Sequence, residues 1–323
     1  MLNSLLQMSL SPKELQEHCE IILKSREIQN KIVVLCEGKI PEIQGIKSVQ
    51  SYKAMKETPD ASFYMACIPR WWRQKRPEFF NCGNRKDVID TYFTLSILHQ
   101  QDSTNSYLDP DRLFAIIDLD LQAEAIYNYI FTDTEAIFRN LYAKSEVQEQ
   151  NAAQHRIWIT GLIHKEAYFL TPELQSLFDD YPNSPIYQEN LASLTNIYSD
   201  MADGISNDRD LQNNLQRAFD RINHCSGLDC TELDVGKFQD SWKHKFQNTT
   251  DTTQKHELIV ALLTIKKAKK YWHKIKRPGD WSCDEQQVFR EQLSLEIGRF
   301  YSQQGSDVKC HIPFFFKTLY ECV

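Results

Sequence analysis

Two apolar runs that end abruptly in acidic residues constrain the fold of this chain more than any other feature. The run KIVVLC at residues 31–36 leads into Glu37, and the run LFAII at residues 113–117 leads into Asp118 and Asp120. Both runs are short and rich in β-branched residues, so they predict buried strands of a parallel sheet. Because parallel strands place their carboxyl ends at one edge of a sheet, we expect the three acids to meet there.

Helical segments alternate with strands over the first half of the chain. A capping box at Ser11 and Glu14 marks the start of the first helix. The expected helices are residues 12–28, 48–57, 84–98 and 135–142, and the expected further strands are residues 78–82 and 129–131. Residues 63–68 fit a helix end or a strand equally well. This alternation indicates an α/β fold with a mostly parallel sheet and helices on both faces.

The second half of the chain is predicted to be mainly helical. Residues 143–155 are polar and show no apolar face, so we place a boundary there, between an α/β domain at residues 1–145 and a helical domain at residues 146–323. Helical periodicity follows at residues 191–202, 210–222, 238–246, 253–276 and 284–301. An apolar run that begins at residue 157 is a candidate extra strand.

Composition restricts the class of protein. The 323 residues are 41% hydrophobic and 25% charged, without a signal peptide or a membrane-spanning apolar run, so we expect a cytoplasmic protein with no membrane contact. Nine scattered cysteines without a C-x-x-C pair predict free thiols. The net charge of −7 argues against indiscriminate coating of nucleic acid but permits a local basic groove.

The three acids suit a metal site. Asp118 and Asp120 are two residues apart, so in an extended segment they point to the same side and can share a cation. Carboxylate oxygens are the ligands preferred by Mg²⁺, and also suit Mn²⁺. A single acid after a strand can also cap the next helix, but that explanation is harder to sustain for all three.

The order of these motifs resembles the TOPRIM family. The likeness consists of an apolar strand followed by Glu37-Gly38-Lys39, the turn and helix start NCGNRKDV at residues 81–88, and a second apolar strand followed by Asp-x-Asp. Topoisomerases, bacterial primases and the overcoming-lysogeny-defect nucleases share that fold. The motifs DASFY at residues 60–64 and TDT at residues 132–134 are similar to those of stand-alone phage-defence nucleases, including those of the PARIS system. The resemblance covers residues 30–142.

The resemblance implies a metal-dependent nuclease. Glu37 would act as general base or metal ligand, while Asp118 and Asp120 would hold Mg²⁺ or Mn²⁺ against a phosphate oxygen. The residues suggested to neutralise phosphate are Lys39, Arg85 and Lys86, although each also suits a solvated surface. A free intracellular nuclease is hazardous, so we expect control by a regulatory sensor protein or by homo-oligomerisation.

The chain departs from the family pattern at two places. Gln122 stands where many members carry a third acid, so we expect a site for one divalent ion. Ile137 and Phe138 stand where related sequences carry another acid. An inactive regulatory module that binds nucleic acid or protein therefore remains an alternative.

Two basic stretches that contain aromatic residues are candidates for nucleic-acid binding, because unpaired bases stack on aromatic rings while cations bind the backbone. Their candidate contacts are Arg70, Trp71, Trp72, Arg73, Lys75 and Arg76 in the first stretch, and Lys266, Lys267, Lys269 and Lys270 in the second. The first stretch is placed on the side that a substrate approaches. The tryptophans suit a core equally well, and the lysines suit a solvated helix face.

Other chemistries are weaker alternatives. A haloacid-dehalogenase-like phosphohydrolase would use Asp118 as nucleophile and Asp120 as acid, but Leu121 and Gln122 follow where those enzymes usually carry glycine and threonine. His164 and Glu166 could add an acid/base group, although a histidine after an apolar run is more often structural. A zinc site is disfavoured by its ligand spacing; its candidate ligands are His224, Cys225, Cys230, Cys310 and His311.

Overall fold

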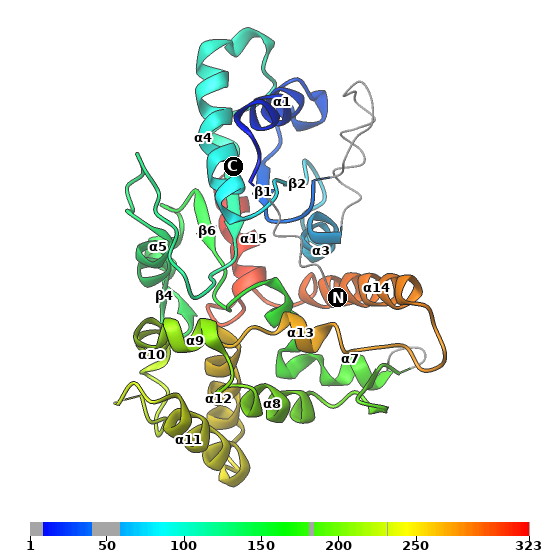
Figure 1. Cartoon of the computed structure of the whole chain (residues 1–323). Coiled ribbons are helices and arrows are strands. Elements are labelled where there is room, and N and C mark those ends of the chain that lie inside the picture. Colours follow the sequence, from blue (N-terminus) through cyan, green and yellow to red (C-terminus); the bar gives the residue numbers. More distant parts are fainter. Residues whose placement is uncertain (1–8, 41–58, 181–183, 231, 323) are drawn as a thin grey trace.

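A four-stranded, all-parallel sheet forms the centre of the upper part of the chain in the computed structural model (Figure 1). Its strands are β1 (Val33–Cys36), β2 (Glu78–Asn81), β3 (Leu113–Ile117) and β6 (Ile157–Ile159), in the order β2-β1-β3-β6. Val33 lies opposite both Glu78 and Leu113, so the three strands end level with one another. The structure describes residues 9–40, 59–180, 184–230 and 232–322.

Helices cover both faces of this sheet, as the alternation predicts. The crossover from β1 to β2 carries α3 (Pro59–Cys67), and the crossover from β2 to β3 carries α4 (Arg85–Gln101). These two crossovers run in opposite directions along the sheet, and right-handed connections therefore place α3 and α4 on opposite faces. The helix α1 (Pro12–Leu23) packs on α4, and α15 (His311–Glu321) shares the face of α3, where Phe316 contacts Phe79.

The fourth strand differs from the expectation. Residues 129–131 are not a strand; the ring of Tyr129 packs on Phe93, and its hydroxyl accepts the backbone N–H groups of Arg156 and Ile157. These aromatic residues therefore meet the start of β6 instead of extending the sheet. The fourth strand is β6, the run that begins at residue 157. It lies beyond residue 145, and the boundary predicted there stays a prediction.

Short helices dominate the rest of the chain, in the lower half of Figure 1. They are α5 (Thr134–Leu141), α6 (Glu149–Ala152), α7 (Gln175–Asp180), α8 (Leu194–Asp203), α9 (Arg209–Asn213), α10 (Leu215–Ile222), α11 (Val235–Asn248), α12 (Thr252–Ile265), α13 (Lys269–Trp272) and α14 (Cys283–Tyr301). Two small hairpins pair β4 (Tyr142–Ala143) with β5 (Glu146–Val147) and β7 (Ile186–Tyr187) with β8 (Asn190–Leu191).

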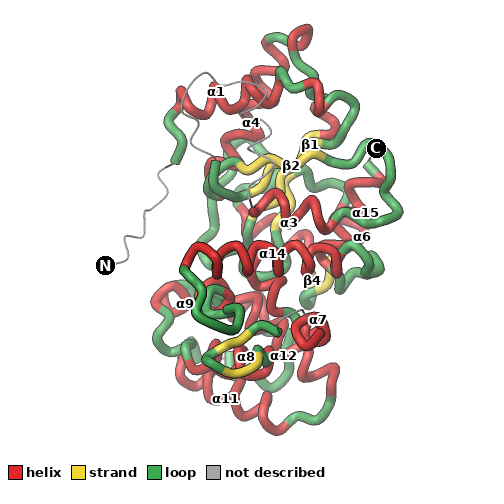
Figure 2. Tube along the Cα trace, turned by 90° about the vertical axis from the view of Figure 1, so that its right-hand side faces the viewer, coloured by secondary structure: helices red, strands yellow, loops and turns green. Residues whose placement is uncertain are grey.

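The two parts of the chain are joined by α14. Figure 2 shows α14 passing between the sheet above and the smaller helices below, with α3 against it. Gly298 allows this close crossing, because a Cβ atom there would lie 2.6 Å from Ala66 Cβ and 3.0 Å from the Phe63 carbonyl oxygen. Residues 63–68, which the sequence left undecided, belong to α3 over most of their length.

Several helix limits differ from the predicted ones. The first helix ends at Leu23 and is followed by a short 3₁₀ turn (Arg26–Ile28). The segment predicted as one helix at residues 253–276 is broken after Ile265, and the one predicted at 210–222 is broken at Asn214. The terminal helix α15 was not anticipated, and the helix predicted at residues 48–57 lies outside the described residues. None of the described helices is both long and apolar enough to cross a membrane.

Candidate functional site

Glu37 and Asp118 are in contact at the carboxyl edge of the sheet. They follow the neighbouring strands β1 and β3, and the Asp118 backbone N–H donates a hydrogen bond of 2.8 Å to Glu37 Oε1. The Lys165 backbone N–H donates in turn to Asp118 Oδ1, at 3.0 Å. The paired strands thus bring together two acids that are 81 residues apart in the sequence.

Asp120 lies beside this pair, on a turn of unusual backbone conformation. Its φ of 40° falls in the left-handed region, which aspartate tolerates better than most residues. Its N–H donates to the Ile163 carbonyl at 2.9 Å, which ties the turn to the segment after β6. The Arg85 guanidinium at the start of α4 lies 3.9 Å from Asp120 Oδ2, so one cation faces this acid directly.

Burial and mutual repulsion disfavour the charged forms of these acids. Burial raises the pKa of Glu37 to about 7; the hydrogen bond from Asp118 opposes the shift, and repulsion from Asp120 adds to it. The pKa of Asp118 is raised well above its ordinary value by burial, by Glu37 and by Glu166. Both acids therefore resist ionisation near neutral pH, chiefly because burial removes their charged forms from water.

Further charged residues reach the acid edge from elements that the sequence did not connect with it. Lys165 is ion-paired with Asp60 of α3, and its ammonium lies 3.9 Å from Glu166 Oε1. Burial lowers the pKa of Lys165, and the negative charge of Glu166 opposes this lowering. Asp60 belongs to the DASFY motif, a signal that could have pointed to it. Lys165 has no comparable signal beyond its place between His164 and Glu166.

His164 has a structural partner as well as an acidic one. Its Nε2 accepts the Ala268 backbone N–H at 3.0 Å, and its Nδ1 lies 3.0 Å from Glu166 Oε2. Because Nε2 is the acceptor, Nδ1 carries the proton and faces the carboxylate. His164 thereby joins the segment after α12 to the acid edge.

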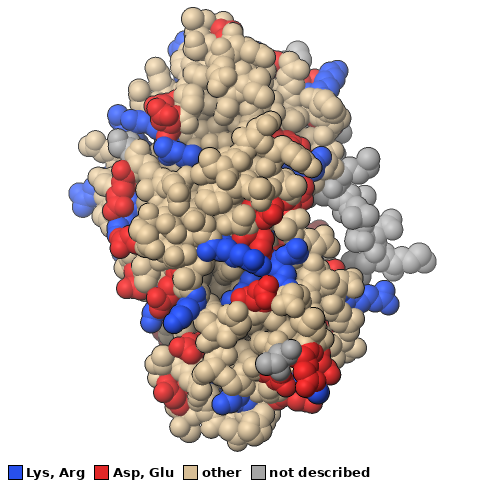
Figure 3. All heavy atoms as spheres, turned by 90° about the vertical axis from the view of Figure 1, so that its left-hand side faces the viewer, with Lys and Arg blue, Asp and Glu red and all other residues tan. Residues whose placement is uncertain are grey.

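The second basic stretch reaches this edge, but not as one exposed helix face. Lys269 and Lys270 are exposed, and Lys269 lies near enough to lower the pKa of Lys165. Lys267 pairs with Asp210 at 2.6 Å; although partial burial lowers its pKa, Asp210 and Asp120 raise it. Figure 3 shows lysine and arginine side chains gathered around a hollow in the middle of one face, with acidic side chains beside them.

Lys266 departs from the prediction. Its side chain is fully buried, and its ammonium donates to the Gly204 carbonyl at 2.7 Å and to Asp208 Oδ2 at 2.5 Å. An ammonium held in this way is a structural group and is not available to a phosphate. Periodicity placed it outside because the helix was assumed to continue past Ile265.

The first basic stretch lies at the opposite edge of the sheet. Residues 70–76 come directly before β2, and therefore at the amino ends of the strands, away from the edge that carries Glu37 and Asp118; that they bind nucleic acid stays a prediction. Trp72 is buried, whereas Trp71 is 52% exposed and packs on Tyr320 of α15. The cations here, Arg70, Arg73, Lys75 and Arg76, are exposed.

The suggested phosphate-neutralising residues separate in the structure. Arg85 is largely buried beside Asp120, whereas Lys86 is exposed and lies 3.8 Å from Asp90 on the outer side of α4. Lys39 is exposed directly after the turn that follows β1. Gln122 is exposed on the loop after Asp120 and adds no acid to the edge.

The carboxylates at this edge are of the ligand type that a divalent ion prefers. The donor set consists of carboxylates, and a cation would oppose the mutual repulsion that adds to the effect of burial on their pKa values. Over the described ranges, however, no three acidic, histidine or cysteine side chains converge closely enough to form a ready-made ligand cage, and the zinc alternative has no such cluster either.

Comparison with known proteins adds no assignment: no family model, curated protein or solved structure matches the chain.

Proposed function

We propose that the protein is a Mg²⁺-dependent nuclease that cleaves phosphodiester bonds at the carboxyl edge of its sheet. The observation that carries the proposal is the direct contact of Glu37 with Asp118, two acids with raised pKa values, with Arg85 and Lys165 near enough to act on Glu37. The resemblance to TOPRIM nucleases supports it independently, through the order Glu-Gly then Asp-x-Asp.

The acids and cations divide the work of hydrolysis. Bound Mg²⁺ would supply Lewis-acid stabilisation of the charge that develops on the phosphate. Glu37, with a pKa of about 7, is suited to accept a proton from the attacking water at neutral pH. The hydrogen bonds to Asp118 Oδ1 and Glu37 Oε1 orient both carboxylates before substrate arrives.

Cations around the acids suit a phosphate backbone. Arg85 lies at one side of Asp120, and Lys267 and Lys269 lie on the segment that His164 ties to the site. A protein of net charge −7 needs such a local excess of positive charge to bind a polyanion. A role in phage defence under a sensor protein belongs to the same proposal, since it is carried by the resemblance.

Cleavage assays test the proposal. The native protein and the variants Glu37→Ala, Asp118→Ala and Glu321→Ala are incubated with plasmid, single-stranded DNA, RNA and p-nitrophenyl phosphate, with Mg²⁺, with Mn²⁺ or with EDTA. We expect metal-dependent cleavage of nucleic acid that Glu37→Ala and Asp118→Ala reduce at least about a hundredfold. Glu321, exposed on α15, is the matched control and should leave the rate unchanged.

Three outcomes would contradict the proposal. Cleavage that survives both site substitutions would place the chemistry elsewhere. Turnover of p-nitrophenyl phosphate alone would identify a phosphohydrolase that uses Asp118 and Asp120. Binding of nucleic acid without any cleavage would identify the non-enzymatic module.

A further inference from the structure

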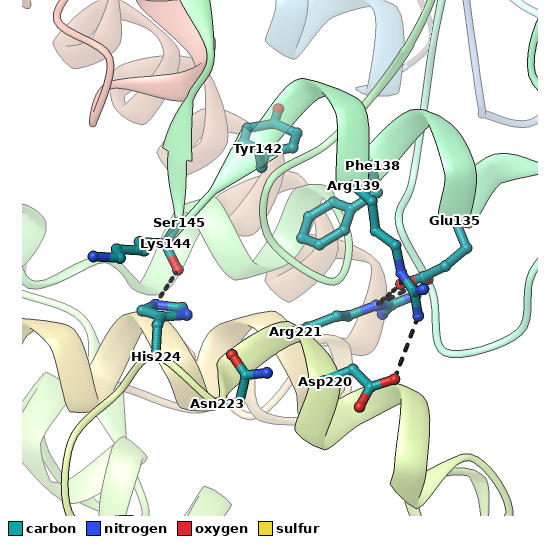
Figure 4. Close-up of a pocket in the computed structure, with 10 residues that line it drawn as sticks. All are labelled: Glu135, Phe138, Arg139, Tyr142, Lys144, Ser145, Asp220, Arg221, Asn223 and His224. Atoms are coloured by element: carbon teal, nitrogen blue, oxygen red, sulfur yellow. Dashed lines mark hydrogen bonds and ion pairs between the residues drawn. The ribbon is translucent and has the colours of Figure 1, made fainter.

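A pocket of about 250 Å³ lies between α5, the β4–β5 turn and α10, outside the acid edge (Figure 4). Phe138 and Tyr142 supply aromatic walls, and Arg221, Asn223 and Ser145 supply polar groups. The volume exceeds that of a single water molecule many times over, so the pocket can admit a small ligand group. None of these residues was singled out from the sequence as part of a site.

Arg221 is the most unusual residue of this pocket. Its side chain is 1% exposed, and its Nε and Nη2 donate to Glu135, with the Nη2–Oε2 distance at 2.6 Å. Its Nη1 is buried and has no hydrogen-bond partner in the part of the chain that the structure describes. A buried guanidinium donor without an acceptor is costly, and an acceptor from a ligand would satisfy it.

Polar groups line the pocket from the end of α10 and from the β4–β5 turn. Asn223 is exposed, lines the pocket and has no interaction with the other residues drawn in Figure 4, which shows its amide directed toward the space beside Arg221. The Ser145 hydroxyl lies 3.2 Å from His224 Nε2 and closes the opposite end. Asn223 and Arg221 can therefore offer N–H groups to the same oxygen-rich ligand.

The charge of the pocket favours an anion. Arg139 enters from α5, 59% exposed, and meets Asp220 at 3.4 Å, while Arg221 meets Glu135. The charges within each of these two pairs cancel. Lys144, which also lines the pocket, therefore gives the pocket a net charge of one positive unit. In Figure 4, the Lys144 side chain extends away from these ion pairs.

The same helix leads from this pocket to the acid edge. Arg217 precedes Arg221 by four residues, which is one turn of α10, or about 5–6 Å along a helix surface. Arg217 Nη1 donates at 2.6 Å to the carbonyl of Leu121, the residue after Asp120. Asp120 is also near enough to Arg221 to favour its charged form. A single strand of nucleic acid could therefore contact both the pocket and the acid edge.

We propose that this pocket is a phosphate-binding subsite, in which Arg221 Nη1 and the Asn223 amide hold one phosphate group. The assignment of this phosphate to the strand cut at Glu37 and Asp118 rests on the proposed function. The binding of phosphate in the pocket does not rest on that function. The two sources of the group are an internal phosphate of a strand and the phosphate of a free mononucleotide.

A pair of amide-to-acid substitutions tests the subsite without requiring cleavage. Asn223→Asp places a negative charge in the pocket, and Asn213→Asp makes the same change on exposed α9, outside the pocket lining. Binding of a labelled single-stranded oligonucleotide is measured by fluorescence anisotropy in EDTA, and binding of adenosine monophosphate by calorimetry. We expect Asn223→Asp to raise the oligonucleotide Kd about tenfold and Asn213→Asp to leave it unchanged.

The mononucleotide identifies the source of the phosphate. If the native protein binds adenosine monophosphate and Asn223→Asp abolishes that binding, the pocket is a site for free nucleotides. If Asn223→Asp weakens only oligonucleotide binding, the pocket holds a phosphate of a strand. Equal affinities of the two variants for both probes would overturn the subsite. Lys144→Gln is a second check, because Lys144 is the cation of the pocket that has no acidic partner there: it should lower the slope of log Kd against log salt by about 0.7, and no change would also count against the subsite.

The outcomes for the two proposals are distinguishable. A protein that binds through Asn223 but cleaves no substrate retains the subsite and loses the nuclease function. A protein that cleaves, and binds its substrate equally well with Asn223→Asp, retains the function and loses the subsite.

Discussion

Glu37 lies in surroundings that disfavour its charged form, so the free energy of unfolding should change with pH as Glu37 titrates. Its folded pKa of about 7 lies above the ordinary 4.5, so the folded protein binds this proton more tightly than the unfolded chain. That contribution is fully present below about pH 4.5 and is lost as pH rises through about 7. Glu37→Gln abolishes the titration, so the variant should exceed the native protein in free energy of unfolding by about 1–3 kcal/mol at about pH 8.

Urea unfolding at about pH 4.5 and about pH 8 measures this difference, with Glu321→Gln as the matched control. The stabilising effect of Glu37→Gln should fall below about 0.5 kcal/mol at the lower pH, where the folded glutamate is neutral and the unfolded one is about half ionised. An effect of equal size at both values would mean that Glu37 titrates normally.

Lys266 gives a second prediction at the same scale. Because its buried ammonium satisfies Gly204 and Asp208, Lys266→Met should leave an unpaired carboxylate and lower the free energy of unfolding by about 2–4 kcal/mol. Lys13→Met, on a side chain that is 87% exposed, should change it by less than about 0.5 kcal/mol. Thermal or urea unfolding of the two variants measures this difference. Equal stability of the two variants would contradict a structural role for Lys266.

At the scale of elements, the segment between β6 and the following 3₁₀ helix (Lys165–Leu170) organises the site. Ile163 accepts from Asp120, and Lys165 donates to Asp118. Tyr168 holds the same segment from behind, because its hydroxyl accepts the Gly161 and Leu162 N–H groups at 2.8 and 3.2 Å and lies 3.1 Å from His311 Nδ1.

Tyr168→Phe should therefore loosen this segment without altering the acids. We expect a loss of about 1–3 kcal/mol in stability, because two buried N–H groups lose their acceptor. Hydrogen exchange should become faster at Gly161 and Leu162, as followed by mass spectrometry. Tyr320→Phe, at a ring that is 53% exposed, is the control. Unchanged protection at both amides would show that Tyr168 does not hold the segment.

The elements that could be predicted are those whose local pattern determines them. The short apolar runs of β1, β2 and β3 favour buried strands of a sheet. The capping boxes at Ser11 and Ser282 mark the starts of α1 and α14. The aromatic run at residues 129–131 has the composition of a strand, but its rings find partners beside β6. The helix α12 ends at Ile265, and Lys266 is held by Gly204 and Asp208, distant residues that no local pattern connects with it.

The same distinction applies to the candidate site. Glu37 and Asp118 were expected to meet because the ends of parallel strands are a consequence of topology. Asp60 and Lys165 join them through contacts across the fold, and the pocket at Arg221 is formed by α5 and α10. Such contacts are set by how elements pack, and so they are not visible in sequence spacing.

At the scale of the whole molecule, the two edges of the sheet carry different groups. The carboxyl edge holds the acids and the cations Arg85, Lys165 and Lys269, whereas the amino edge holds Trp71, Tyr320 and an exposed basic stretch. Both edges offer cations in a chain of net charge −7, so a bound polyanion could follow either. The proposed chemistry requires the carboxyl edge.

Matched charge removals at the two edges decide which one binds nucleic acid. Lys269→Gln and Arg73→Gln each remove one exposed cation, from the carboxyl and the amino edge respectively. Binding of a single-stranded oligonucleotide in EDTA is measured over a range of salt concentrations. Lys269→Gln should weaken binding and lower the salt slope by about 0.7, because one phosphate contact is lost, while Arg73→Gln should leave both unchanged. The reverse result would place the strand across Trp71 and Tyr320, away from Glu37, and would contradict cleavage at the acid edge.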